Sequence, residues 1–411
     1  MKVFLKKFSI PIFFIFIFIF IRTLYYRNLF VFIYDQASSS IKVLEIWKNR
    51  QFTLIGPPMS LKVENRQIFF GGISYYIQLC FQLIGNFDPF WSTYAFMVFS
   101  ALMIFPLYEG IKKLINKKCA VTILILYSLL PFFIESTYSL WNPNFMFALM
   151  PLLLFFMSKF KNNHSYWFFL IFSLLNGVLF QLHYTYIFTF IGLGIYYFFI
   201  KKLSFKYFIL YCLGFVIGTS NLIIFELRHN FYLLQTLLIF ISHPKNVSQH
   251  WFADYYALSQ IFFFFIIVAY ILRKKITTKL NILLFITLLL ITIPYVTIYA
   301  KGRNRPKNWF YKDELYVYKI IKKKFSSVND FNIFEFYDAT ANTQKYFLKR
   351  DGLQINYEDY YHNKYLYVIY HNDQYMKDPA YEVASFKPNR IIQKWNINNY
   401  YIMILLERLN R

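Results

Sequence analysis

Long apolar runs constrain the fold of this chain more than any other feature of its sequence. Ten such runs can be read along it: Phe8–Leu24, Ile68–Ile84, Pro89–Tyr108, Ala120–Ile134, Asn144–Met157, Tyr166–Leu182, Tyr184–Ile200, Tyr207–Phe225, Tyr255–Leu272 and Leu280–Ala300. A helix of about 20 residues crosses a hydrocarbon core of roughly 30 Å. Only 16% of the residues are charged, whereas soluble domains have about 25%. The chain is therefore predicted to be a polytopic membrane protein.

The net charge of +24 would indicate nucleic-acid binding in a soluble protein. Here lysines in the loops between spans account for the charge, so we expect no nucleic-acid partner. Cys80, Cys119 and Cys212 lie in apolar segments without metal-ligand spacing. The N-terminus resembles a signal peptide, but the apolar run is long and no small-residue cleavage site follows it. This favours an uncleaved first span.

Basic residues predict how the chain crosses the membrane, because cytoplasmic loops are enriched in Lys and Arg. The basic clusters are Lys2/Lys6/Lys7, Lys112/Lys113/Lys117/Lys118, Lys159/Lys161, Lys201/Lys202/Lys206 and Arg273/Lys274/Lys275/Lys279. All five clusters lie on the same side of the membrane only if an odd number of the apolar runs that precede Lys112 does not cross it. Ile68–Ile84 is the most polar early run, so it fits an interfacial or re-entrant helix best. We predict about nine spans in the cell (inner) membrane, with a cytoplasmic N-terminus.

The composition changes after Lys301, where a Gly- and Pro-containing basic stretch ends the last apolar run. Helical periodicity at Asp313–Phe325 and Asn342–Lys349 then alternates with three strand-like runs. These runs are Asn332–Tyr337, Tyr365–Tyr370 and Tyr400–Leu406. The predicted organisation is an all-α polytopic domain over residues 1–300 and a small α/β extracytoplasmic domain over residues 301–411.

The first outer loop contains the strongest candidate for a catalytic residue, Asp35. It precedes Ala37–Lys48, whose pattern predicts a short helix on the membrane surface. A rigid turn at Gly56-Pro57-Pro58 and the cations Lys62 and Arg66 follow. Cations that hold a phosphate, with a carboxylate that takes a proton from a hydroxyl, suit transfer from a phosphate-linked donor. The alternative is that Asp35 caps the N-terminus of the helix.

Three more polar clusters are predicted to lie on the same outer side. Trp141 and Asn142 stand in a polar turn, which could also be an Asn-Pro helix start with an interfacial Trp anchor. His183 ends a span and could equally be a buried interface residue. Glu226 and Arg228 end a later span, where the arginine could bind phosphate bidentately or the two could form a structural clasp. Four polar clusters on one face favour a site there.

Four short motifs carry a resemblance to a known family. They are Tyr34-Asp35-Gln36, then Gly56-Pro57-Pro58 with Gly71-Gly72-Ile73-Ser74-Tyr75-Tyr76, then Trp141-Asn142-Pro143, and finally Phe225-Glu226-Leu227-Arg228-His229. With these the chain resembles the bacterial GT-C membrane glycosyltransferases, in particular the branch (family 39) related to aminoarabinose transferase and protein O-mannosyltransferase. The resemblance covers residues 1 to about 300. Gly72-Ile73 and Gln36 depart from the usual family pattern.

The resemblance implies transfer of a sugar from a polyprenyl-phosphate donor to a lipid, glycan or protein acceptor at the extracytoplasmic face. Asp35 would be the catalytic carboxylate, and Arg228 with Lys62 or Arg66 would hold the lipid phosphate. The remaining candidates for the substrate pocket are Gln36, Trp141, Asn142, His183 and Glu226. No metal and no cofactor are expected, because side chains alone can neutralise a monophosphate leaving group.

A second function class is a flippase or transporter of lipid-linked oligosaccharides without catalysis. Transporters place polar groups near the bilayer midplane on broken helices and often contain inverted repeats. In this chain the acidic residues lie at the predicted outer rim and the span interiors carry almost no charge. That distribution favours surface chemistry over a pathway through the membrane.

Overall fold

The computed structural model describes residues 2–63, 65–163, 165–242, 257–299, 306–324, 330–337, 340–353, 362–371 and 380–409. The chain divides into two compact units, each described here by itself. The helical unit comprises Met1–Tyr25 and Arg50–Ile298, and the C-terminal unit comprises Tyr26–Asn49 and Tyr299–Arg411. The segment at residues 301–305, where the sequence analysis ends the last span, lies outside the described residues.

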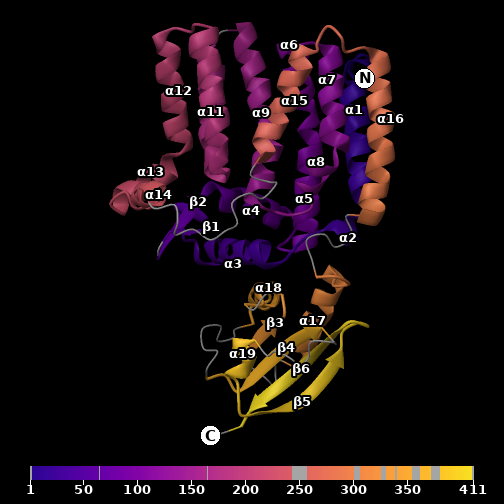
Figure 1. Ribbon diagram of the computed structural model, residues 1–411, viewed down its shortest axis with the longest axis vertical. Coiled ribbons are helices and arrows are strands. Elements are labelled where there is room, and N and C mark those ends of the chain that lie inside the picture. Colours follow the sequence, from indigo (N-terminus) through magenta and orange to yellow (C-terminus); the bar gives the residue numbers. More distant parts are fainter. Residues whose placement is uncertain are drawn as a thin grey trace. The chain divides into compact units, whose positions relative to one another are not determined.

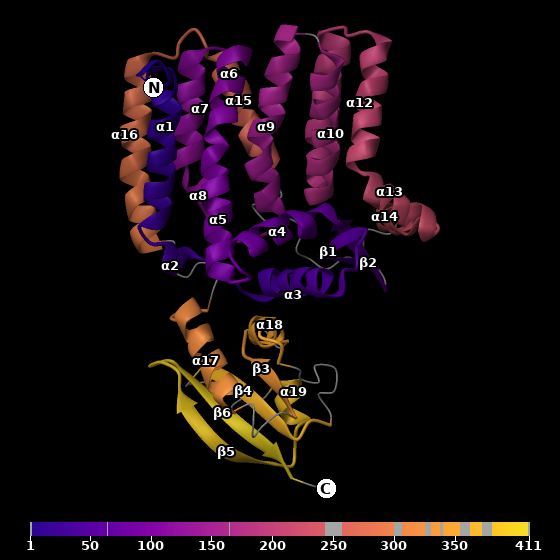
Figure 2. The same ribbon diagram turned by 180° about the vertical axis from the view of Figure 1, so that it is seen from behind.

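The helical unit is built from helices, most of which run alongside one another, while α4, α13 and α14 lie across one end of them (Figures 1 and 2). They are α1 (Lys2–Thr23), α4 (Ile73–Ile84), α5 (Pro89–Leu102), α6 (Ile104–Leu114), α7 (Lys117–Leu129), α8 (Pro131–Glu135), α9 (Asn142–Asn163), α10 (Tyr166–Leu182), η1 (Tyr184–Tyr186), α11 (Ile187–Ile195), η2 (Tyr196–Ile200), α12 (Phe205–Gly218), α13 (Ser220–Arg228), α14 (Tyr232–Ser242), α15 (Leu258–Ile271), α16 (Thr278–Pro294) and the π-turn η5 (Tyr295–Tyr299). Every predicted apolar run overlaps at least one of these helices.

Several of these helices have the length and composition of a membrane span. Within the described residues, three qualify by themselves: Pro89–Leu114, Asn142–Lys161 and Thr278–Ile298. A fourth span results if the bent pair Phe205–Gly218 and Ser220–Arg228 counts as one. Shorter apolar helices account for most of the other predicted runs. The count of nine crossings stays a prediction.

Breaks divide some of the predicted runs into two helices. The run Tyr207–Phe225 becomes α12 and α13, which meet at an angle of 67°. Ala120–Ile134 becomes α7 and α8, with Leu130 in an extended conformation between them (ψ 123°). Because Leu130 precedes Pro131, its helical conformation is disfavoured by contact with the proline ring. The bend between α12 and α13 places the motif Glu226–Arg228 on a separate helix, α13, rather than at the end of a straight span.

A β-hairpin occupies the part of the first loop where the sequence predicts a rigid turn. Strand β1 (Ile55–Val63) contains Gly56-Pro57-Pro58 and pairs with β2 (Arg66–Gly71) in antiparallel fashion. The predicted turn at this motif is thus wrong. Prolines are tolerated here because β1 has only one neighbour and its register is irregular on both sides of Pro58. The run Ile68–Ile84 begins in β2, and its helix α4 starts only at Ile73.

The C-terminal unit is built on a four-stranded sheet with the strand order β3-β4-β6-β5. Its strands are β3 (Phe331–Glu335), β4 (Tyr365–His371), β5 (Asn389–Asn396) and β6 (Tyr401–Arg408), and its helices are α2 (Tyr26–Leu29), α3 (Tyr34–Asn49), α17 (Tyr311–Lys324), α18 (Asn342–Arg350) and α19 (Tyr381–Ala384). β3 and β4 are parallel, and β6 is antiparallel to both β4 and β5. All predicted helical and strand stretches are present; β5 was not predicted.

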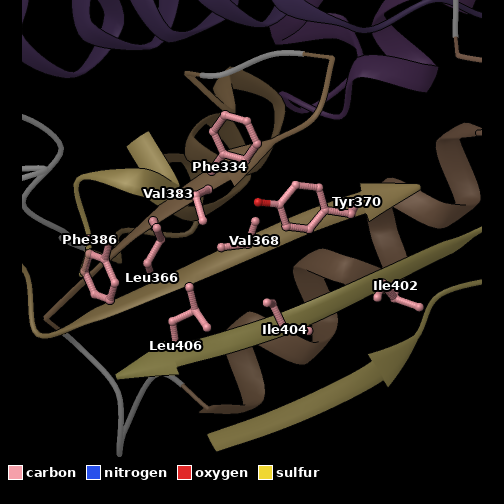
Figure 3. Close-up of a cluster of buried hydrophobic side chains, with 9 residues drawn as sticks. All are labelled: Phe334, Leu366, Val368, Tyr370, Val383, Phe386, Ile402, Ile404 and Leu406. Atoms are coloured by element: carbon pink, nitrogen blue, oxygen red, sulfur yellow. The ribbon is translucent and has the colours of Figure 1, made fainter. Parts of the chain in front are cut away.

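The core of the C-terminal unit lies on both faces of its central strands. On one face a cluster of buried side chains fills the space beside the sheet (Figure 3): Phe334, Leu366, Val368, Tyr370, Val383, Phe386, Ile402, Ile404 and Leu406. The intervening residues of β3, β4 and β6, such as Ile333, Ile369 and Met403, are also fully buried. Strands buried on both faces are expected where helices cover a sheet.

Helix α3 belongs to this unit, although it precedes most of the helical unit in the sequence. The predicted helix Ala37–Lys48 is confirmed as part of α3, which packs against α18. Phe32, just before α3, is buried against the rings of Tyr346 and Phe347, with centroid distances of 5.2 and 6.0 Å. The side chain of Lys349 pairs with Glu45. Both apolar and ionic contacts therefore join residues that lie about 300 positions apart.

Candidate functional site

The β1–β2 hairpin is held against neighbouring backbone so closely that two of its positions require glycine. A Cβ atom at Gly56 would lie 2.3 Å from the carbonyl oxygen of Gly71. A Cβ atom at Gly71 would lie 2.1 Å from Oε1 of Gln181 at the end of α10. Real Cβ contacts do not come so close, so the Gly-Pro-Pro and Gly-Gly motifs are explained by close approach between the hairpin strands and α10.

Side chains from the helix ends fix the hairpin through its backbone. The Tyr184 hydroxyl donates to the Phe69 carbonyl at 2.5 Å, and the Asn221 amide donates to the Leu54 carbonyl at 3.0 Å. The Tyr232 hydroxyl accepts a hydrogen bond from the backbone amide of Gln67 at 3.0 Å. These donors and acceptors come from η1, α13 and α14. The hairpin, α13 and α14 therefore form one rigid group of elements.

Glu226 stabilises the start of α14. Its two carboxylate oxygens accept hydrogen bonds from the backbone amides of Leu233 and Leu234, both at 2.9 Å. A carboxylate at this position satisfies orphan donors and complements the helix dipole. Within the part of the chain that the structure describes, Glu226 and Arg228 form no ion pair. Glu226 therefore caps a helix and does not form the clasp that was the alternative to phosphate binding by Arg228.

Two of the predicted phosphate-binding cations flank the junction between α13 and α14. Arg228 is the last residue of α13 and its side chain is exposed. Arg66, on β2, donates to Oε1 of Gln235 at 3.2 Å and lies 5.4 Å from the ring centroid of Tyr232. Lys62 pairs with Gln67 in the hairpin register, while its side chain lies outside the described residues. Two guanidinium groups beside one helix junction could bind a lipid phosphate.

His183 has the surroundings of a structural residue. It is 1% exposed, its Nδ1 lies 2.7 Å from the Thr185 hydroxyl, and its ring lies beside Phe70. Burial lowers the pKa of His183 to about 4. The imidazole is thus neutral at physiological pH and supplies no positive charge for a phosphate.

Trp141 and Asn142 form the helix start that the sequence analysis gave as the alternative to a binding role. Asn142 is the first residue of α9, and its buried amide donates to the Leu182 carbonyl at 2.8 Å. The Trp141 carbonyl accepts from the amides of Asn144 and Phe145, both at 3.0 Å. Asn142 thereby ties the start of α9 to the end of α10. The partly buried Trp141 ring remains the member of this pair whose side chain is better placed to meet a substrate.

Asp35 and Gln36 belong to the C-terminal unit, whereas the cations described above belong to the helical unit. Asp35 is the second residue of α3 and is exposed. Gln36 is buried, and its Oε1 accepts from the backbone amide of Ile33 at 3.4 Å, in the manner of a capping box. The capping position is therefore that of Ile33, and Asp35 lies within the first turn. The positive end of the helix dipole there favours the ionised carboxylate.

Sequence analysis missed a fully buried arginine, Arg22, near the end of α1. Its guanidinium donates to the carbonyls of Ser128 at 2.8 Å and Tyr127 at 3.4 Å, at the end of α7. A regular helix would satisfy the Tyr127 carbonyl from position 131, but Pro131 has no N–H. Arg22 also bonds the hydroxyl of Thr137 at 3.0 Å. An arginine inside the apolar run Phe8–Leu24 was the available signal.

Residues 72–225 match the family model of dolichyl-phosphate-mannose-protein mannosyltransferases. The match supports membership of the GT-C glycosyltransferase family. The matched region runs from Gly72, before α4, to Phe225 on α13, and so includes Trp141, Asn142 and His183. Asp35, Arg66, Glu226 and Arg228 lie outside it.

The other comparisons add no relatives: neither curated proteins nor solved structures give a match. The match nevertheless favours a glycosyltransferase, and the apolar helices agree with a membrane protein. Among the described residues, no group of three or more His, Cys, Asp and Glu side chains is arranged to hold a metal ion.

Proposed function

We propose that this protein transfers a sugar from a polyprenyl-phosphate donor to a hydroxyl group of a lipid, glycan or protein acceptor. The reaction takes place at the extracytoplasmic face of the cell membrane. The observation that carries this proposal is the family match over residues 72–225, which lies entirely in the helical unit. The rigid group formed by the hairpin, α13 and α14 supplies a platform for the donor.

Asp35 is the proposed catalytic carboxylate. It accepts the proton of the acceptor hydroxyl while the acceptor oxygen bonds to the anomeric carbon of the sugar. The bond between that carbon and the phosphate oxygen breaks, and the polyprenyl phosphate leaves with the electron pair. The exposure of Asp35 and its position in the first turn of α3 support this role, because the base must be accessible and ionised.

Arg228 and Arg66, together with Lys62, are the proposed ligands of the donor phosphate. Arginine binds phosphate through two parallel hydrogen bonds and neutralises the charge of the leaving group. The exposed guanidinium of Arg228 stands next to the capped start of α14, and Arg66 approaches the same helix from the hairpin. Trp141 is the proposed contact for the sugar ring, whereas Gln36, Asn142, His183 and Glu226 support the site through the structural bonds described above.

The deciding experiment compares Asp35→Asn with Ser38→Ala. Ser38 is also exposed and lies about one turn after Asp35 on α3. Both variants are purified as the full chain and assayed with defined polyprenyl-phosphate sugars. Loss of a general base lowers turnover by about 10²- to 10⁴-fold, so we expect that loss in Asp35→Asn alone. Donor binding should persist in both variants.

A flippase would respond differently to the same substitution. If the protein moves lipid-linked sugars without chemistry, Asp35→Asn should leave transport into liposomes unchanged and no glycosylated product should form with either variant. Turnover that survives in Asp35→Asn would remove Asp35 from the mechanism while leaving the family assignment intact.

A further inference from the structure

A groove on the helical unit lies away from the hairpin, at the opposite ends of the helices. It is formed by α1, α7 and α16, which stand side by side in both views of the molecule (Figures 1 and 2). Its cavity volume is about 680 Å³, within the range of about 300 to 1,000 Å³ that small-molecule sites occupy. The lining residues at its mouth come from the N-terminal ends of α7 and α16.

The walls of the groove are apolar. Phe13 on α1 and Phe285 on α16 face one another with ring centroids 5.9 Å apart, and Val121 and Ile125 on α7 line the same space. An acyl chain would replace contacts between these side chains and solvent or disordered lipid with continuous apolar contact. The groove therefore matches the shape and polarity of a hydrocarbon chain.

The mouth of the groove is positively charged. Lys117 and Lys118, the first two residues of α7, are both exposed and line it, and none of the described lining residues is acidic. The N-terminus of α16 adds a second helix-dipole end of the same sign. Positive charge at the end of an apolar groove complements a lipid with an anionic head group.

Hydrogen bonds hold the mouth in a fixed geometry. The Thr122 hydroxyl donates to Oδ1 of Asn281 at 2.7 Å, and Nδ2 of Asn281 donates to the Lys118 carbonyl at 3.0 Å. These bonds join α7 to α16 directly behind the two lysines. The lysine backbone is thus positioned before any ligand binds, which lowers the entropic cost of binding.

We propose that this groove binds an anionic phospholipid, with one acyl chain between α1, α7 and α16 and the phosphate at Lys117 and Lys118. The site is separate from the proposed donor site, because it lies at the lysine-rich end of the unit rather than at the hairpin. Sequence analysis predicts that this end is cytoplasmic, where anionic lipids are enriched.

The test uses the full chain in nanodiscs of equal parts phosphatidylglycerol and phosphatidylcholine, followed by native mass spectrometry of the lipids retained after release. Wild-type protein should retain phosphatidylglycerol in preference to phosphatidylcholine. The double variant Lys117→Gln/Lys118→Gln should lower that preference about 10-fold, since each lysine near a charged surface favours anionic lipid. The control Lys201→Gln/Lys202→Gln removes two exposed lysines outside the groove and should change nothing.

A second variant tests the acyl part of the site with both lysines in place. Val121→Phe fills the groove and should reduce retention of both lipids, while monodispersity on size exclusion shows that the protein is folded. The proposal is overturned if the preference survives in the Lys117/Lys118 variant, if the control loses it equally, or if Val121→Phe retains lipid normally. It is also overturned if an equimolar polyprenyl phosphate displaces the phosphatidylglycerol, which would identify the groove as a donor site.

Discussion

The two units of this protein satisfy their polar groups in different ways. In the helical unit, buried polar side chains bond mainly to backbone carbonyls: Arg22 to the end of α7, Asn142 to Leu182 and Gln181 to Gly218. In the C-terminal unit, charged side chains bond to one another, as in the pairs Lys349–Glu45 and Arg390–Glu407. Their outer surfaces differ as well, because Phe199 and Leu290 of the helical unit are 76% and 68% exposed.

This difference agrees with the surroundings predicted for each unit, which are hydrocarbon for the helical unit and water for the C-terminal unit. Helices in hydrocarbon must satisfy their backbone internally, and a charge without water needs several fixed partners. A unit in water can place ion pairs at its surface at low cost and gains little from each. Substitutions of polar residues should therefore have large effects in the helical unit and small ones in the C-terminal unit, where apolar contacts dominate.

The largest expected effect is at Arg22. Arg22→Met removes the donor from three carbonyls, those of Tyr127 and Ser128 at the end of α7 and that of Phe133 on α8. Pro131 has no N–H to supply to the Tyr127 carbonyl instead. Buried acceptors without partners cost about 1–3 kcal/mol each, so for three carbonyls we expect a loss of about 6 kcal/mol. Thermal unfolding of the full chain in detergent, followed by size-exclusion retention, measures it.

Thr23→Val is the matched control for Arg22. It changes the next residue of α1, whose exposed hydroxyl bonds only within the helix, to the Ile19 carbonyl at 2.6 Å. This variant should unfold at nearly the wild-type temperature. Equal unfolding temperatures for the two variants would contradict the view that Arg22 holds the helix ends together.

The next effect concerns an apolar contact in the C-terminal unit. Phe32→Ala removes a ring that is 5% exposed and packs on Tyr346 and Phe347. Truncation of a buried Phe costs about 3–5 kcal/mol, and here the loss should appear as faster hydrogen exchange in α3. If Asp35 is catalytic, turnover should fall as well. Phe52→Ala, at a position that is 89% exposed, serves as the control and should leave exchange unchanged.

The same comparison explains what the sequence could predict. Long apolar runs in the helical unit and alternating runs in the C-terminal unit both have strong periodic signals, so their helices and the strands β3, β4 and β6 were predicted. Strand β5 was not, because as an edge strand it reads Asn-Arg-Ile-Ile-Gln-Lys-Trp-Asn and exposes most of its side chains. Charged edges of this kind protect a sheet from pairing with other chains and lack an apolar alternation.

Local sequence patterns did not predict packing between residues that are far apart in the chain. The assignment of α3 to the C-terminal unit depends on Phe32 and Glu45 meeting residues about 300 positions later. A local pattern also does not show that Gly56 lies against Gly71, or that Gly71 lies against Gln181, so closely that neither glycine position has room for a Cβ atom. Of the candidate site, the helix start at Asn142 was foreseen as an alternative, whereas the capping roles of Glu226 and Gln36 were not.

A moderate effect is expected from acid on the C-terminal unit. Burial alone would raise the pKa of Asp351, but hydrogen bonds from Lys322, Tyr318 and Arg350 lower it to about 2 from 3.8. A depressed folded pKa contributes stability above the unfolded pKa, and this stability is lost as pH falls from about 4 to about 2. After allowance for solvent screening the contribution is about 1 kcal/mol.

Pepsin cleavage of the full chain between pH 4 and pH 2 measures this acid response. Asp351→Asn should be cleaved faster than wild type at pH 4 and at the same rate at pH 2, because its stability no longer depends on that proton. A constant ratio of the two rates across this range would show that the Asp351 bonds do not contribute to folding.

The smallest effect separates ionic from apolar attachment of α3. Glu45 pairs with Lys349 across to α18 and with Lys42 within α3 at 3.3 Å, and despite burial these lysines lower its pKa. Because the carboxylate and both ammonium groups are partly exposed, each pair should contribute about 0.5 kcal/mol. A double-mutant cycle with Glu45→Gln and Lys349→Gln, measured by hydrogen exchange in α3, should give a coupling free energy near that value. The parallel cycle with Glu45→Gln and Lys42→Gln should change the stability of the helix without changing the docking of α3. Zero coupling in the first cycle would mean that Phe32 and its neighbours hold α3 by apolar contact alone, so that both units would rely on packing and differ only in what their surfaces meet.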